Sequence, residues 1–160
     1  MGVLRIDHPD IEEFIRCKQN TSKLTNFNIS VAVTDEFMGC LRTGQPFELK
    51  WGGRVYRTVD AKALWSEIMR STWDYAEPGV LFIDTMNKMN NLNYCETLAA
   101  TNPCAEQPLP PDGACLLGSF NLVKYLQDTG NSPWEDGTKE YSFNYSQFKA
   151  DIPPRCPSYG

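Results

Sequence analysis

Short apolar runs alternate along this chain with segments that have the spacing of helices. The runs lie at residues 2–7, 27–33 and 80–84, and a helical pattern comes before or after each of them. Two strands joined through a helix usually lie parallel in one sheet, because the helix carries the chain back to the edge at which the first strand began. The alternation therefore predicts an α/β fold with a mostly parallel sheet.

The expected helix boundaries are marked by residues that cap or interrupt a helix. Pro9 suits the first position of a helix after the first run, and Thr34 is a good N-cap after the second. From Thr58 to Ala76 the apolar residues recur at helical spacing, and Pro78-Gly79 ends the pattern. These signals predict a helix between each pair of strands.

The remaining segments predict smaller elements. Gly52-Gly53 separates two strand-like stretches and predicts a hairpin on the surface. Residues 116–126 indicate a strand that runs into a helix, and a last short helix is predicted near residues 146–152. Between them, residues 127–145 are rich in turn-forming residues, which indicates a solvated connection.

The composition narrows the possible functions. The chain has 160 residues and a formal net charge of −5, so it lacks the basic character that would neutralise the phosphates of a nucleic-acid polymer. No apolar run reaches the roughly 20 residues of a membrane span, and the first residues do not resemble a signal peptide. We therefore expect a soluble cytoplasmic protein with no membrane partner.

Cysteine and histidine usage argues against a metal site. The six cysteines contain no C-x-x-C pair and the chain has a single histidine, His8, so no metal-binding residue is predicted. Isolated cysteines usually act as small buried apolar residues, which we expect of Cys17, Cys40 and Cys95. His8 is expected to have a structural role at a helix start.

One loop gathers residues that are typical of chemistry. Residues 102–122 read NPCAEQPLPPDGACLLGSFNL, and four prolines between residues 103 and 111 exclude a helix there. If residues 102–106 are extended, Asn102, Cys104 and Glu106 point to one side. A proline-stiffened loop with a buried cysteine and a solvated glutamate explains the same residues equally well. Spacing alone leaves both alternatives open.

This loop resembles the active-site loop of the ribonucleotide reductase large subunit, most closely that of the adenosylcobalamin-dependent class. The signature is N-P-C-small-E-Q-P-L followed by G-A-C-L-L-G-S-x-N-L. Four further stretches resemble the same family in the same order: GVLRIDHPDIEEFI, NFNISVAVTDEFM, VYRTVDAKALWSEIMRSTWDYAEPGVLFIDTMN and NLNYCETLAATNPCAEQ. The resemblance runs from about Gly2 to Pro154, and the closing RCPSYG departs from the family.

The resemblance implies a fold and an organisation. Residues 1–160 would be a single segment of a ten-stranded α/β barrel. The segment would comprise part of the first half-barrel, the central active-site finger loop at residues 102–115 and the start of the second half-barrel. The first barrel strand and the phosphate-binding loops are not among these residues. We therefore expect the segment to be inactive by itself and to need the remainder of the reductase chain as its partner.

The resemblance also implies a chemical role for four residues of the loop. Cys104 matches the cysteine that becomes a thiyl radical and takes the 3′ hydrogen of the ribose. Glu106 matches the general base for the 3′ hydroxyl, and Asn102 matches the amide that hydrogen-bonds the sugar while the 2′ hydroxyl leaves. Cys115 matches one of two cysteines that form a disulfide while they reduce the substrate, and its partner lies on a strand before this segment.

The segment from Lys18 to Asn26 resembles the family's specificity loop. In the family, that loop couples the identity of the bound effector nucleotide to the choice of the substrate's base. Lys18, Gln19 and Asn20 are accordingly predicted to contact the base or the effector. A solvated connection between a helix and a strand is the alternative that the composition leaves open. The family's partners would be a ribonucleoside diphosphate or triphosphate, a dNTP or ATP effector, and a thioredoxin- or glutaredoxin-type reductant.

The implied cofactor is adenosylcobalamin, and the alternative within the family is a small subunit that carries a diiron or manganese centre. Two other classes of function remain open. One is a non-catalytic remnant that binds nucleotides. The other is a thiol-redox protein that uses Cys104 and Cys115, although about ten residues of stiff loop separate these cysteines, whereas redox pairs are usually two residues apart.

Overall fold

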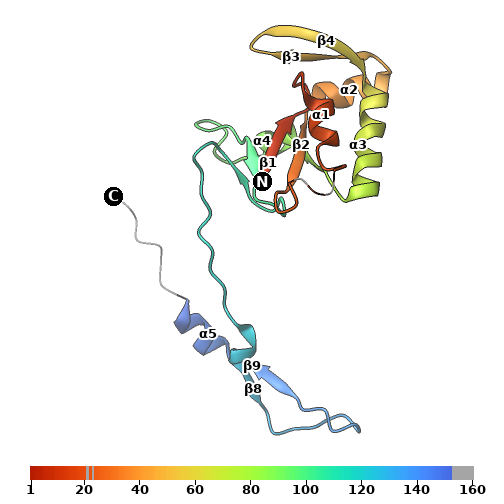
Figure 1. The fold of residues 1–160 in the computed structure, drawn as a ribbon. Helices are drawn as coiled ribbons and strands as arrows, with labels where there is room; N and C mark the ends of the chain where they lie inside the picture. Colours follow the sequence, from red (N-terminus) through yellow and green to blue (C-terminus); the bar gives the residue numbers. More distant parts are fainter. Residues whose placement is uncertain (21, 23, 153–160) are drawn as a thin grey trace. The chain divides into compact units, whose positions relative to one another are not determined.

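The computed structural model describes residues 1–20, 22 and 24–152. It divides into a first unit, Met1–Cys115, and a second unit, Leu116–Gly160 (Figure 1). Among the described residues, no helix combines the length and the apolar character that crossing a membrane requires.

A three-stranded parallel sheet forms the centre of the first unit. Its order is β1 (Gly2–Arg5), β2 (Ile29–Val33) and β5 (Gly79–Phe82), and the central strand β2 is buried along its whole length. The predicted α/β class with a mostly parallel sheet is therefore confirmed. In the part of the chain that the structure describes, this sheet is open, so the ten-stranded barrel expected from the resemblance is not confirmed.

Three helices cover one face of the sheet: α1 (Ile11–Arg16), α2 (Asp35–Thr43) and α3 (Ala61–Tyr75) (Figure 1). Because side chains alternate along a strand, Val31 and Val33 of β2 face these helices while Ala32 faces the opposite way. The core on the first face consists of Ile6, Ile11, Ile15, Val31, Val33, Phe37, Phe47, Leu49, Ala61, Leu64 and Ile68. Its burial provides the main stabilising contribution to this unit.

A fourth helix, α4 (Ile83–Met89), packs on the opposite face of the sheet. Ile83 and Leu98 contact Ala32 in a second, smaller core. The expected strand at residues 80–84 therefore ends two residues early, at Phe82, and the sequence patterns missed this helix. Its short length explains the omission, since two turns contain too few apolar repeats to show a helical period.

Of the three helix starts predicted from the sequence, only that of α2 matches the structure. Thr34 caps α2 as predicted, because its Oγ1 accepts the backbone N–H of Phe37 at 3.2 Å. The prediction that Pro9 opens α1 is wrong, since that helix begins at Ile11. The helix predicted from Thr58 begins at Ala61, because residues 58–60 pair in a strand and Asp60 provides the cap.

The predicted hairpin consists of β3 (Pro46–Trp51) and β4 (Arg54–Asp60), with both turn glycines at positive φ. The sequence predicted that this hairpin lies on the surface, and that prediction is wrong for the face that carries Phe47 and Leu49. Phe47 and Leu49 are fully buried in the main core, and Phe47 stacks edge-on against Phe37 at 5.0 Å between ring centroids. The hairpin is thus part of the packed unit.

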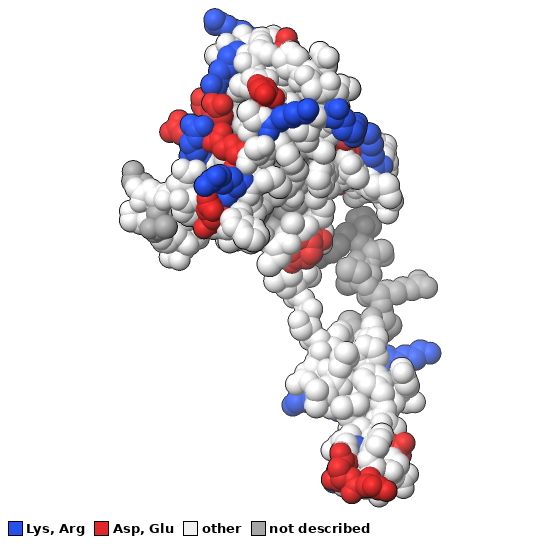
Figure 2. All heavy atoms as spheres, turned by 90° about the vertical axis from the view of Figure 1, so that its right-hand side faces the viewer, with Lys and Arg blue, Asp and Glu red and all other residues white. Residues whose placement is uncertain are grey.

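The second unit contains a 3₁₀ turn η1 (Leu122–Tyr125), strands β8 (Leu126–Asp128) and β9 (Tyr141–Phe143), and helix α5 (Tyr145–Asp151). The predicted last helix is confirmed, and the Asn144 side chain caps it by accepting the N–H of Gln147 at 2.9 Å. The aromatic residues Phe120, Tyr125, Phe143 and Phe148 pack on one another. Acidic side chains gather at one end of this unit (Figure 2).

The strand and helix predicted at residues 116–126 are wrong. Residues 116–121 form no strand, only the short 3₁₀ turn follows, and Leu116 and Leu117 are almost fully exposed. A strand needs a neighbour to satisfy its backbone groups, and none of the described strands pairs with this stretch. Residues 153–154, expected to end the last helix, and the tail with Cys156 lie outside the described residues.

Candidate active site

The loop with Asn102, Cys104 and Glu106 is the turn of a short antiparallel hairpin. Its strands are β6 (Ala100–Thr101) and β7 (Pro108–Leu109), with Thr101 opposite Pro108. The backbone N–H of Asn102 donates to the carbonyl of Gln107 at 3.2 Å, and the N–H of Ala105 donates to the carbonyl of Asn102 at 3.0 Å. The active-site candidates therefore lie on one closed turn.

This geometry corrects the extended conformation considered for residues 102–106. Ala105 has a φ of 65°, so the chain reverses and the alternation of side chains expected of a strand does not apply. Asn102 contributes to the reversal, because its Oδ1 accepts the N–H of Gln107 at 3.0 Å. The three predicted residues still lie on one turn, with Asn102 half-buried and Cys104 and Glu106 exposed.

Cys115 lies beyond this hairpin, at the end of the first unit. The segment leading to it turns at Asp112, which has a φ of 60°, and Gly113 donates its N–H to the carbonyl of Pro110 at 3.1 Å. Cys104 and Cys115 are both free thiols and both exposed. Both thiols are therefore open to solvent in this chain.

The other cysteines are less uniform than expected. Cys17 and Cys40 are half-buried, and burial raises the pKa of the Cys17 thiol above its usual value. Cys95 is exposed in a turn, where its Sγ donates to the carbonyl of Leu92 at 3.4 Å, so its expected burial is wrong.

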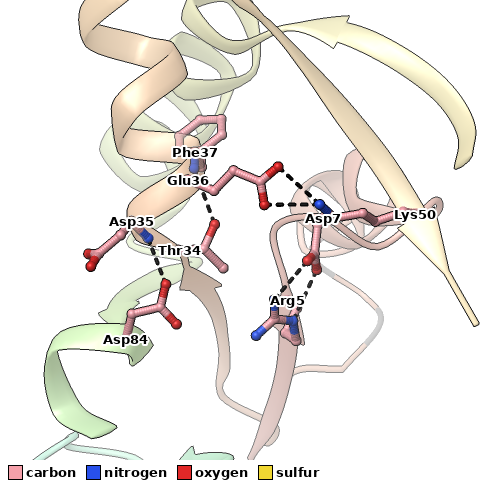
Figure 3. A network of polar contacts seen from close by, with 8 residues as sticks. All are labelled: Arg5, Asp7, Thr34, Asp35, Glu36, Phe37, Lys50 and Asp84. Atoms are coloured by element: carbon pink, nitrogen blue, oxygen red, sulfur yellow. Dashed lines mark hydrogen bonds and ion pairs between the residues drawn. The ribbon is translucent and has the colours of Figure 1, made fainter. Parts of the chain in front are cut away.

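A network of charged side chains lies at the carboxyl ends of the parallel strands (Figure 3). The Arg5 guanidinium donates two hydrogen bonds to Asp7, at 3.1 and 2.7 Å, which raise the pKa of Arg5 above its usual value. Lys50 binds both carboxylate oxygens of Glu36, at 3.0 and 2.9 Å, and the pKa of Lys50 is raised for the same reason. Each of these cations already has an anionic partner, which indicates a role in fixing strand ends.

The predicted specificity loop separates into an anchored start and an exposed middle. Lys18 forms an ion pair with Glu77 at 2.7 Å, and its side chain is only 9% exposed. The other oxygen of Glu77 accepts the N–H of Ile29 at 2.9 Å, so Lys18 connects the loop to the start of β2. Gln19 and Asn20 are exposed, while residues 21 and 23 of the loop lie outside the described residues.

Comparison with known proteins identifies the family. Residues 1–153 match the family described as "Ribonucleotide reductase, barrel domain". The chain belongs to this family. This membership confirms the family resemblance stated from the sequence, and the match covers every residue that the structure describes.

Individual relatives point to one branch of the ribonucleotide reductase family. The chain is 38% identical over 155 residues to a protein of Thermoplasma acidophilum named "Vitamin B12-dependent ribonucleoside-diphosphate reductase", covering 95% of this chain and 20% of the relative. A protein of the same name from Mycobacterium tuberculosis CDC 1551 is 36% identical over 138 residues, covering 84% and 20%. A Streptomyces clavuligerus protein, "Vitamin B12-dependent ribonucleotide reductase", is 31% identical over 173 residues, covering 92% and 17%. The chain spans about a fifth of the length of these relatives.

The described residues contain no group of three or more His, Cys, Asp and Glu side chains that could hold a metal ion. The Nδ1 of His8 accepts the backbone N–H of Asp10 at 3.1 Å, and its ring stacks edge-on against Trp51 at 4.9 Å. His8 therefore contacts the N-cap residue of α1 and the hairpin strand β3.

Sequence patterns missed two polar residues that hold the site region in place. Glu77 links Lys18 to β2, and Asn87 of α4 binds the backbone of Leu98 just before the hairpin. Both act on partners far away in the sequence, so no local motif indicates them. Glu77 precedes a proline and Asn87 lies in a polar stretch, where either residue type is common.

Replacing Lys18 by methionine should loosen the start of the specificity loop. The change leaves the Glu77 carboxylate without its partner in a partly buried position, which we expect to weaken local stability by about 1–2 kcal/mol, or roughly 5- to 30-fold. Thermolysin cuts before large apolar residues such as Leu24 and Phe27, so native-state cleavage within the loop should accelerate by that factor. Lys62→Met, at an exposed lysine, is the control, and equal cleavage rates in both variants would contradict the anchoring role.

Proposed function

We propose that this chain is the segment of a B12-dependent ribonucleotide reductase that carries the radical-bearing hairpin. The observation that supports this most strongly is that Asn102, Cys104 and Glu106 all lie in the turn of one hairpin. Family membership and the names of the relatives support the same function. The three parallel strands would be part of a ten-stranded barrel that the remainder of the reductase completes.

In this proposal Cys104 begins the reaction as a thiyl radical, and adenosylcobalamin supplies that radical when it is bound to the complete protein. The S–H bond of Cys104 forms as the C3′–H bond of the ribose breaks. The Glu106 carboxylate accepts the proton of the 3′ hydroxyl. Asn102 donates a hydrogen bond to the sugar through its side-chain nitrogen, because its oxygen is already bound to Gln107.

Reduction then requires two electrons and two protons from thiols. Cys115 and a second cysteine outside these residues form a disulfide, the 2′ hydroxyl leaves as water, and a hydrogen takes its place at C2′. Cys104 finally returns its hydrogen to C3′, and Glu106 returns the proton to the 3′ oxygen. A thioredoxin- or glutaredoxin-type dithiol restores the pair. The substrate is a ribonucleoside diphosphate or triphosphate in the cytoplasm, and a dNTP or ATP effector acts through the loop with Gln19 and Asn20.

The test is the cofactor requirement of the complete protein. With adenosylcobalamin and a dithiol, it should convert ribonucleotides to deoxyribonucleotides without any second protein, as measured by chromatography of the products. This chain alone should form no product under the same conditions, because the second cysteine lies outside it. A strict requirement for an iron- or manganese-bearing subunit would contradict the cobalamin part of the proposal. Absence of product under every condition would contradict the reductase function.

A further inference from the structure

The hairpin with Cys104 begins at a residue that a side-chain amide holds in place. Just before β6, the backbone N–H of Leu98 donates to the Oδ1 of Asn87 at 2.8 Å. The side-chain nitrogen of Asn87 donates to the carbonyls of Leu98 and Ile83, both at 3.0 Å. The side chain of Asn87 thus binds both backbone groups of Leu98, as a neighbouring strand would.

The partners fix the orientation of this amide. The backbone N–H of Leu98 can only donate and the two carbonyls can only accept, so the oxygen of Asn87 must face the former and the nitrogen the latter. Three of the four hydrogen bonds that an amide can make are therefore used within the protein. No other side chain of this size supplies one acceptor and two donors in this arrangement.

The helix that carries Asn87 is itself fixed to the sheet. Asp84 of α4 accepts the backbone N–H of Asp35, the first residue of α2, at 2.8 Å (Figure 3). Lys88, also on α4, pairs with the Asp35 carboxylate. Ile83 and Leu98 pack together against β2 in the second core. Helix α4 is therefore fixed to α2 and to β2. Through Asn87 it also holds Leu98, the residue just before the hairpin, which we call the root of the hairpin.

We propose that Asn87 is a positioning residue that sets the place of Cys104 through the root of the hairpin. The inference rests on the proposed function, since it matters for reaction only if Cys104 takes the ribose hydrogen. Leu98 is followed by Ala99, whose N–H donates to the carbonyl of Leu109 at 3.0 Å, then by β6 and by Cys104 in the turn. Radical transfer depends steeply on distance, and a displacement of about 1 Å at a reacting atom can lower a rate about 100-fold.

The experiment compares Asn87→Asp and Asn87→Leu with the wild type in the complete reductase. Asp keeps the acceptor for Leu98 N–H but places a carboxylate against two carbonyls, and Leu removes all three hydrogen bonds. We expect kcat to fall about 10- to 100-fold while the KM for the ribonucleotide changes less than about 2-fold. The matched controls are Asn91→Asp and Asn91→Leu, at an exposed asparagine whose side chain makes no hydrogen bond to the described residues.

Amide hydrogen exchange gives a second readout that does not depend on activity. The hydrogen-bonded amides of Ala99, Asn102 and Ala105 should exchange at least about 10-fold faster in the Asn87 variants, while those of β2 keep their wild-type rates. Faster exchange with a lowered kcat supports the proposal. Unchanged exchange, or faster exchange with an unchanged kcat, would overturn it. If the wild-type protein shows no reductase activity, the proposed function fails, and the exchange rates alone then decide whether Asn87 holds the hairpin.

Discussion

Replacement of Cys104 by serine in the complete reductase is expected to abolish turnover, with a fall in kcat of more than about 10³-fold. Sulfur is soft and polarisable and stabilises an unpaired electron, whereas the O–H bond of serine is too strong for a hydroxyl to serve as the radical carrier. The exposed position of Cys104 on the turn makes the exchange of one atom easy to accommodate. The loss should therefore reflect chemistry and leave the fold unchanged.

The measurement is deoxyribonucleotide formation together with nucleotide affinity. Binding of the ribonucleotide should stay within about 2-fold of the wild type, because the hairpin turn is held by backbone groups and by Asn102. Cys95→Ser is the matched control, since Cys95 is also exposed but lies in a different turn. Normal repeated turnover by Cys104→Ser would remove Cys104 from the radical role.

Replacement of Cys115 by serine should separate substrate consumption from product formation. Serine cannot form a disulfide, so the two electrons for reduction would be missing even though Cys104 could still take the 3′ hydrogen. We expect the variant to consume some substrate abortively with external thiols, while deoxyribonucleotide formed over repeated cycles falls by more than about 10³-fold.

The decisive quantity is the ratio of deoxyribonucleotide formed to ribonucleotide consumed. This ratio should be near one in the wild type and near zero in Cys115→Ser. Glu106→Gln provides a useful contrast, because loss of the general base should slow consumption and product formation together by about 10²- to 10⁴-fold. A Cys115→Ser enzyme that makes product at the wild-type rate would show that the reducing pair lies elsewhere.

Several features of the fold could be predicted because their causes are local. Thr34 caps α2, and Gly52-Gly53 forms the turn of a hairpin. The apolar spacing of α3 includes the buried Ala61, Leu64 and Ile68, although Met69 of the same pattern is exposed. Each depends on residues a few positions apart. The predicted strand after Cys115 shows the limit of such patterns, because an apolar run becomes a strand only where another strand pairs with it.

The sequence by itself determined the α/β class and the family, and it predicted which residues of the loop would carry the chemistry. Only the tertiary structure decided how those residues are presented. Ala105 at positive φ closes the loop into a hairpin, Lys18 is withdrawn into an ion pair with Glu77, and Asn87 holds the root of the hairpin. The physical reason is that these arrangements depend on backbone groups and charges brought together from distant positions, which leave no periodic trace along the chain.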